Sequence, residues 1–116
     1  MDNRKEPRFP VHFRSSFSSA NIVSGMGVLS DLSSGGCRIV SATQVEPGTT
    51  LALRIEVMDE EPPLHIKQVV VRWCRNGRFG VEFISLAPED WARLQLNVKE
   101  LERQPYQREH QDEASA

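Results

Sequence analysis

Apolar and polar residues alternate along most of the chain before residue 85. The clearest segment is 51–57, where leucine, isoleucine or valine occupies every second position. A two-residue period places successive side chains on opposite faces of an extended chain, so it predicts a strand with one buried face. The same pattern, strong or weak, occurs in five other segments: 11–17, 26–31, 37–43, 69–74 and 81–83.

Turn residues separate the predicted strands. The pairs are Gly35-Gly36, Pro47-Gly48, Pro62-Pro63 and Asn76-Gly77. Asn-Gly between two clear strands is a strong signal for a type I′ hairpin, because both central residues of that turn need a positive φ. We therefore expect short strands joined by tight turns.

One helix follows the strands. Pro88 suits the first helical position, and the two acidic residues after it suit the positive end of the helix dipole. Apolar residues then recur at helical spacing: Trp91, Leu94, Val98 and Leu101. Pro105 is expected to end the helix. We expect Trp73 and Trp91 to lie in the core between helix and strands.

These elements predict a mainly β fold, a small antiparallel six-stranded β-barrel with one C-terminal α-helix. A length of 116 residues fits one domain. We expect that domain over 1–103, with a flexible ligand-binding arm at 1–10, the barrel at 11–84 and the helix at 88–103. The polar tail at 104–116 is expected to be disordered.

The net charge and the hydropathy pattern argue against some classes of function. A formal net charge of -2, from 14 basic and 16 acidic residues, argues against binding a nucleic-acid polymer, which usually needs a strongly basic domain. A small anionic ligand needs only a local basic cluster. The sequence has no signal peptide and no apolar run long enough to span a membrane, so we expect a cytoplasmic protein without membrane insertion.

The sequence gives little support for catalysis or metal binding. No serine stands in a nucleophile-elbow context, and the acidic run at 59–61 precedes two prolines, as in a solvated loop. The histidines are scattered, and Cys37 and Cys74 lack metal-ligand spacing. We expect both cysteines to be buried free thiols. No catalytic residue, metal or cofactor is predicted.

A first candidate binding motif lies on the N-terminal arm. Arg4 and Arg8 form an R-x-x-x-R pattern that includes Lys5. In an extended segment this even spacing puts both guanidinium groups on one side. Each can donate two hydrogen bonds to a phosphate, or to O6 and N7 of a guanine. The alternative explanation is a solvated, charged terminus.

A second motif, D-x-S-x-x-G, lies between two predicted strands and consists of Asp31, Ser33 and Gly36. An ionised carboxylate only accepts hydrogen bonds, so Asp31 can pair with the N1–H and N2–H groups of guanine. Gly35 and Gly36 allow a flat base to approach the backbone closely. An ordinary turn closed by glycines explains the same residues without a ligand.

Together the two motifs resemble those of the PilZ domain family, R-x-x-x-R followed by (D/N)-x-S-x-x-G. The resemblance continues through residues 71–73 and 80–83, and it covers nearly the whole chain. It implies a bacterial receptor that binds cyclic di-GMP and has no catalytic activity of its own. The ligand-binding residues that it implies are Arg4, Arg8, Asp31, Ser33 and Gly36. Further candidates are Lys5, Gly35 and Arg38, which neighbour the motif residues. Arg72, which precedes Trp73 on a predicted strand, is another candidate, with an ordinary surface arginine as the alternative explanation.

The resemblance also implies a switch and an output. The arm would fold over the ligand, and an effector protein would detect the change of surface. The outputs it implies are motility, pili, biofilm or exopolysaccharide. Two alternatives stay open: a PilZ-fold interaction subunit that does not depend on nucleotide, and a small-barrel binder of single-stranded nucleic acid, which would need exposed aromatic residues beside a basic groove.

Overall fold

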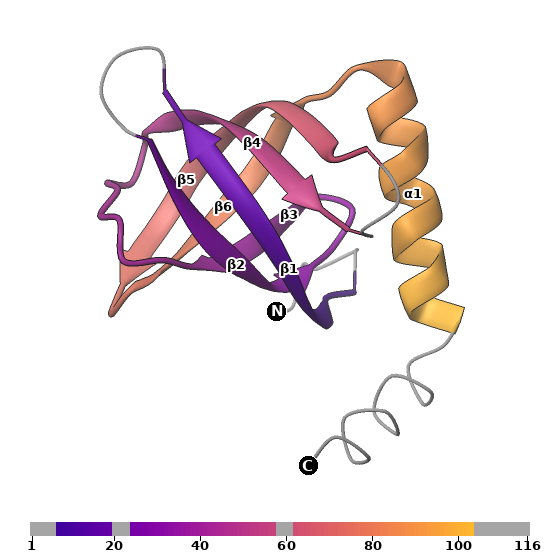
Figure 1. Ribbon diagram of the computed structural model, residues 1–116, viewed down its shortest axis with the longest axis horizontal. Helices are drawn as coiled ribbons and strands as arrows, with labels where there is room; N and C mark the ends of the chain where they lie inside the picture. Colours follow the sequence, from indigo (N-terminus) through magenta and orange to yellow (C-terminus); the bar gives the residue numbers. More distant parts are fainter. Residues whose placement is uncertain (1–6, 20–23, 58–61, 104–116) are drawn as a thin grey trace, which may run out of the picture.

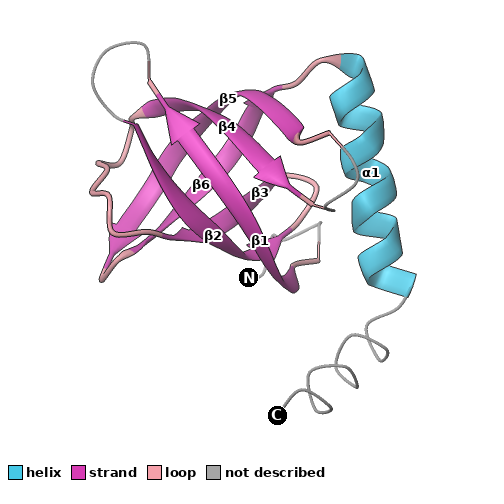
Figure 2. Cartoon of the chain, viewed as in Figure 1, coloured by secondary structure: helices cyan, strands magenta, loops and turns pink. Residues whose placement is uncertain are grey.

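The computed structural model describes residues 7–19, 24–57 and 62–103. Strands make up most of this part of the chain (Figure 2). The elements are β1 (Phe9–Ser18), β2 (Ser24–Leu32), β3 (Gly36–Val40), β4 (Thr50–Glu56), β5 (Leu64–Arg75), β6 (Arg78–Ser85) and α1 (Pro88–Arg103). The helix therefore has the bounds that the sequence predicts.

The six strands close into one antiparallel barrel. Their order is β1-β2-β3-β6-β5-β4, and β4 returns to pair with β1. Figure 1 shows the crossing strands of the barrel with α1 alongside them. This confirms the predicted fold class, a six-stranded antiparallel barrel with one C-terminal helix. Because the barrel is closed, each of the six described strands pairs with a neighbour on both sides, which protects its edges from pairing with another chain.

The alternating sequence pattern fills the interior of the barrel. In β4 burial alternates strictly, so Leu51, Leu53 and Ile55 are buried and their neighbours are exposed. The rings of Phe17 and Phe79 meet edge to face with their centroids 5.2 Å apart. Each such side chain contributes roughly 1.5–3 kcal/mol when it is fully buried. The shared core therefore holds strands that are distant in sequence.

An irregularity in β5 turns Trp73 away from this core. Val71 pairs with Val81, whereas Trp73 pairs with Gly80. Arg72 is thus an extra residue on β5, and a bulge of this kind shifts the alternation of side chains by one position. Val71 is buried, but Trp73 is 37% exposed on the outer surface. The prediction that Trp73 lies in the core is wrong for this reason.

Helix α1 packs against the barrel through Leu94 and Val98, which are both buried. Its first turn is fixed to β5, because Asp90 Oδ1 accepts a hydrogen bond from the backbone N–H of His65 at 3.1 Å. Trp91 lies in the same turn but is 46% exposed, so its predicted place in the core is also wrong. Within the described residues, no helix is long and apolar enough to cross a membrane.

The Asn-Gly turn agrees with the sequence pattern, whereas several strand ends differ from it; β5, for example, begins at Leu64 and not at residue 69. Asn76 and Gly77 have φ values of 54° and 75°, as the predicted type I′ turn requires. β1 begins at Phe9, so the last two residues of the predicted arm belong to the barrel. β3 ends at Val40, three residues before the predicted end, and the next backbone N–H, that of Ser41, donates to the carbonyl of Gly77 at the hairpin turn.

The two cysteines have different environments, which corrects the expectation that both are buried. Cys37 is fully buried, and this burial raises the pKa of its thiol. The nearby carboxylate of Asp31 raises that pKa further, while Arg8 acts in the opposite direction. Cys74 is exposed, near the turn that joins β5 to β6.

We therefore expect a thiol reagent such as DTNB to modify Cys74 quickly and Cys37 only after unfolding. The thiolate is the reactive form, and the core disfavours it at Cys37. The native protein should release one equivalent of the chromophore and the protein in guanidinium chloride should release two, matching its two cysteines. The Cys74→Ser variant should lack the fast phase; a fast phase that survives this substitution would contradict the assignment.

Candidate functional site

One cleft on the outer surface gathers most of the candidate residues. It lies between the segment that precedes β1, the turn between β2 and β3, the outer faces of β5 and β6, and the first turn of α1. Its volume of about 520 Å³ falls in the range of ligand clefts. The candidates that line it are Arg8, Ser33, Gly35, Gly36 and Arg72. We call it the Arg8 cleft.

Asp31 holds Arg8 at this cleft. Nη1 of Arg8 donates a hydrogen bond to Oδ1 of Asp31 at 2.7 Å, and the two residues are 23 positions apart in sequence. The Asp31 side chain is only 13% exposed. Nε of Arg38 lies 3.5 Å from Oδ2 of the same carboxylate, but it is buried without a hydrogen-bond partner. Two guanidinium groups thus offset the cost of removing this carboxylate from water.

Ser33 shapes the turn between β2 and β3. Its hydroxyl accepts hydrogen bonds from the backbone N–H groups of Gly35 and Gly36, both at 3.2 Å. It also donates to the carbonyl of Gly36 at 3.2 Å. The residue is buried, and the turn uses both its donor and its acceptor capacity. In this structure Ser33 therefore positions the backbone of the cleft wall.

Gly36 is required by the packing of the strands. It pairs with Glu82 across β3 and β6. A Cβ atom at this position would lie 2.3 Å from the carbonyl oxygen of Val81, which is part of the backbone and cannot move aside as a side chain could. The glycine of the second motif thus has a structural role besides any contact with a ligand.

A row of residues connects Asp31 to Trp73 across the outer face of the barrel. Asp31 pairs with Arg38, Arg38 with Gly80, and Gly80 with Trp73. A Cβ atom on Gly80 would lie 2.2 Å from Nε1 of Trp73, so the missing side chain makes room for the indole. The guanidinium of Arg38 lies 5.7 Å from the ring centroid, within cation–π range.

Sequence reasoning missed several residues of the cleft lining, among them Trp73, Trp91 and Glu82. For Trp73 a signal was present, because a glycine inside a strand, here Gly80, often marks a close approach. Glu82 accepts a hydrogen bond from Nε of Arg72 at 2.7 Å, so the predicted candidate Arg72 is already paired within the cleft. Both side chains remain at least half exposed.

Two of the predicted candidates, Arg4 and Lys5, lie outside the described residues. The structure therefore brings together Arg8, Asp31 and the Ser33–Gly36 turn, and places Arg38 beside them. Among the residues that the structure describes, no group of histidine, cysteine and acidic side chains could hold a metal ion.

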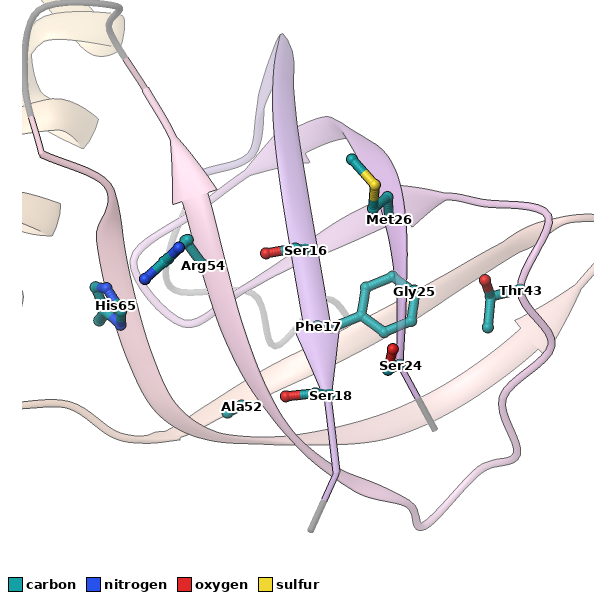
Figure 3. A pocket seen from close by; sticks show the side chains of 10 residues that line it. All are labelled: Ser16, Phe17, Ser18, Ser24, Gly25, Met26, Thr43, Ala52, Arg54 and His65. Atoms are coloured by element: carbon teal, nitrogen blue, oxygen red, sulfur yellow. The ribbon is translucent and has the colours of Figure 1, made fainter. Parts of the chain in front are cut away.

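A second cleft lies elsewhere on the barrel, over β1, β2 and β4 (Figure 3). Small polar side chains line much of it. In Figure 3, Arg54 and His65 lie on one side of β1, whereas Met26 and Thr43 lie on the other. These groups do not converge on one point, and the cleft contains none of the motif residues. The Arg8 cleft is thus the better candidate site.

Comparison with known families identifies the domain. The family model of the PilZ domain matches residues 2–100. The chain belongs to the PilZ domain family. The match includes both motifs of this PilZ domain and nearly all of α1, so it confirms the resemblance noted from the motif residues. A search of curated proteins gave no match.

Solved structures of other PilZ proteins share this fold. The PilZ domain of YcgR from Escherichia coli, determined with c-di-GMP, has a TM-score of 0.74 and 17% identity, covering 94% of this chain and 98% of that one. The PilZ domain of CeSA from a cellulose-synthesizing bacterium has a TM-score of 0.66 and 22% identity, covering 83% and 98%. At such identities the likeness shows the fold alone.

The inhibitor of motility from Bacillus subtilis, MotI/DgrA, is also similar, with a TM-score of 0.72 and 20% identity. The match covers 92% of this chain but only 53% of that protein. The PilZ domain described here therefore spans about half the length of that neighbour.

Proposed function

We propose that this PilZ domain is a receptor that binds cyclic di-GMP in the Arg8 cleft and signals its occupancy to a partner protein. The observation that carries the proposal is the meeting of Arg8, Asp31 and the Ser33–Gly36 turn at one cleft. Membership of the PilZ family and the YcgR structure with c-di-GMP support the choice of ligand.

The groups at the cleft suit the parts of this ligand. The Arg8 guanidinium can donate a pair of hydrogen bonds to a phosphate or to O6 and N7 of guanine. The Asp31 carboxylate can accept from guanine N1–H and N2–H. The exposed ring of Trp73 offers an aromatic face beside them. By their place in the motif, Arg4 and Lys5 belong to the same proposal.

Binding would be an exchange of partners at Asp31. In the structure Arg8 donates to Oδ1 of Asp31, one of the two carboxylate oxygens that would accept from guanine. A guanidinium and the Watson–Crick edge of guanine both present adjacent N–H donors in one plane, so one can replace the other. Arg8, once released, can turn to a ligand phosphate. The exchange keeps the carboxylate paired, which avoids the cost of an unpaired buried charge.

Calorimetric titration with cyclic di-GMP, cyclic di-AMP and GTP tests the proposal. We expect saturable binding of cyclic di-GMP and much weaker binding of the other two. If none of the three nucleotides binds, the domain is instead an interaction subunit that does not depend on nucleotide. The proposed outputs are motility, pili, biofilm or exopolysaccharide, and the names of the MotI and CeSA neighbours mention motility and cellulose synthesis.

The Arg8→Ala variant is expected to bind cyclic di-GMP about 10- to 150-fold more weakly, because a lost charge-assisted hydrogen bond costs roughly 1.5–3 kcal/mol. Arg8→Lys should recover only part of this loss, since an ammonium lacks the planar fork. Arg14→Ala, which removes an exposed arginine from the middle of β1, is the matched control. Unchanged affinity in the Arg4→Ala/Arg8→Ala double variant would refute the role of the arm.

A further inference from the structure

A second cluster of arginines lies next to the Arg8 cleft, on the outer face of β3, β6 and β5. Two rows of paired residues form it. In the first row Arg38, Gly80 and Trp73 are neighbours, and in the second row Val40, Arg78 and Arg75 are neighbours. The inward residues between these rows, such as Ile39 and Phe79, are buried. We call this surface the hairpin patch.

The hairpin patch carries positive charge that the described residues do not neutralise. Arg75 and Arg78 face each other directly across the hairpin. Like charges at directly opposed positions destabilise a strand pair. Among the described residues, no carboxylate lies within ion-pair distance of either arginine, whereas Arg8, Arg38 and Arg72 each have one. Since the whole chain has a net charge of -2, this local excess does not reflect a basic protein.

The patch also has the composition of a protein-binding surface. Arg38, Trp73, Arg75, Asn76 and Arg78 line a shallow cleft at the end of the β5–β6 hairpin. Val40 is 42% exposed at its margin. Tryptophan and arginine are the residues that most often dominate the binding energy of protein interfaces. Arg75 and Arg78 have no carboxylate partner among the described residues, and they lie beside the exposed indole of Trp73. Such a surface is complementary to carboxylates next to apolar side chains.

We propose that the hairpin patch docks an acidic segment of a partner protein. Carboxylates of that segment pair with Arg75 and Arg78, and an apolar side chain packs on Trp73 and Val40. A nucleic-acid strand fits the surface less well, because such sites need a longer basic track with several aromatic residues. The docking itself does not require cyclic di-GMP, although Arg38 and Trp73 adjoin both surfaces.

The test measures binding to two immobilised peptides by biolayer interferometry at low ionic strength. In one peptide glutamate alternates with leucine, and in the other glutamine replaces every glutamate. The patch variant is Arg75→Ser/Arg78→Ser. The charge-matched control is Arg14→Ser/Arg54→Ser, which removes two exposed arginines from β1 and β4, on the other side of the barrel. Circular dichroism and cyclic di-GMP titration check that both variants are folded.

We expect the unaltered protein to prefer the glutamate peptide, the patch variant to lose at least about tenfold in affinity, and the control to stay within about twofold. Equal losses in the two variants, or no preference for glutamate, would overturn the proposal. Tighter binding of a single-stranded RNA that depends on Arg75 and Arg78 would overturn it as well. Failure to bind cyclic di-GMP would refute the proposed receptor function but leave the peptide result unaffected.

Discussion

The Asp31→Ala variant is expected to lose most of its preference for cyclic di-GMP over cyclic di-AMP. In the unaltered protein we expect that preference to be at least about 100-fold, or roughly 2.7 kcal/mol. Adenine presents a lone pair at N1 and has no 2-amino group, so it would set an acceptor against a carboxylate that is only 13% exposed. An unpaired charge in such a place costs several kcal/mol.

Calorimetric titration of each variant with both dinucleotides measures this effect. The control is Glu82→Ala, which removes a carboxylate from the same cleft but leaves Asp31 intact, and it should keep the preference. Asp31→Asn should retain part of it, because the amide carbonyl still accepts one hydrogen bond. If Asp31→Ala weakens both ligands equally, Asp31 serves to hold Arg8 and does not distinguish the bases.

The Gly36→Ala variant is expected to lower the free energy of unfolding by about 2–3 kcal/mol, because overpacking against a fixed neighbour costs this much. The added methyl group would lie 2.3 Å from the Val81 carbonyl oxygen, so β3 and β6 would have to separate. Urea denaturation followed by circular dichroism measures the loss.

Gly80→Ala is the informative comparison for Gly36→Ala. There the added methyl group would meet the indole of Trp73, a side chain that is partly exposed and can rotate outward. The loss of stability should therefore be smaller at Gly80 than at Gly36. A Gly36→Ala variant of normal stability that no longer binds cyclic di-GMP would show that Gly36 acts through the ligand and not through strand packing.

The sequence was sufficient to predict the elements in which apolar residues recur at a regular period. Residues 51–57 alternate without interruption, and the structure buries Leu51, Leu53 and Ile55 and partly buries Val57. Helix α1 has a proline at its start and apolar residues at helical spacing, and its bounds agree with the prediction. In both cases the local pattern and the core favour the same conformation, so no distant contact is needed to infer it.

The alternation of apolar and polar residues was insufficient where the pairing of strands across the barrel decides the direction of a side chain or its contacts. Trp73 continues the alternation of Val69 and Val71, but the extra residue Arg72 turns its side chain outward. Whether a bulge occurs depends on the register with β6, which a single strand does not encode. The contact between Arg8 and Asp31 likewise depends on how β1 pairs with β2. The motifs identified these two residues as candidates, but their hydrogen bond follows only from the folded structure.

Both tryptophans of the chain border the Arg8 cleft, one from the barrel and one from the helix. The protein therefore carries its own optical reporter, since its tryptophan emission comes from the two indoles that border this cleft. Variants that keep one indole each would report separately on the two walls: Trp73 on the rigid sheet, and Trp91 on the first turn of α1. Unequal changes in emission on adding a ligand would reveal whether occupancy of the cleft also displaces the helix.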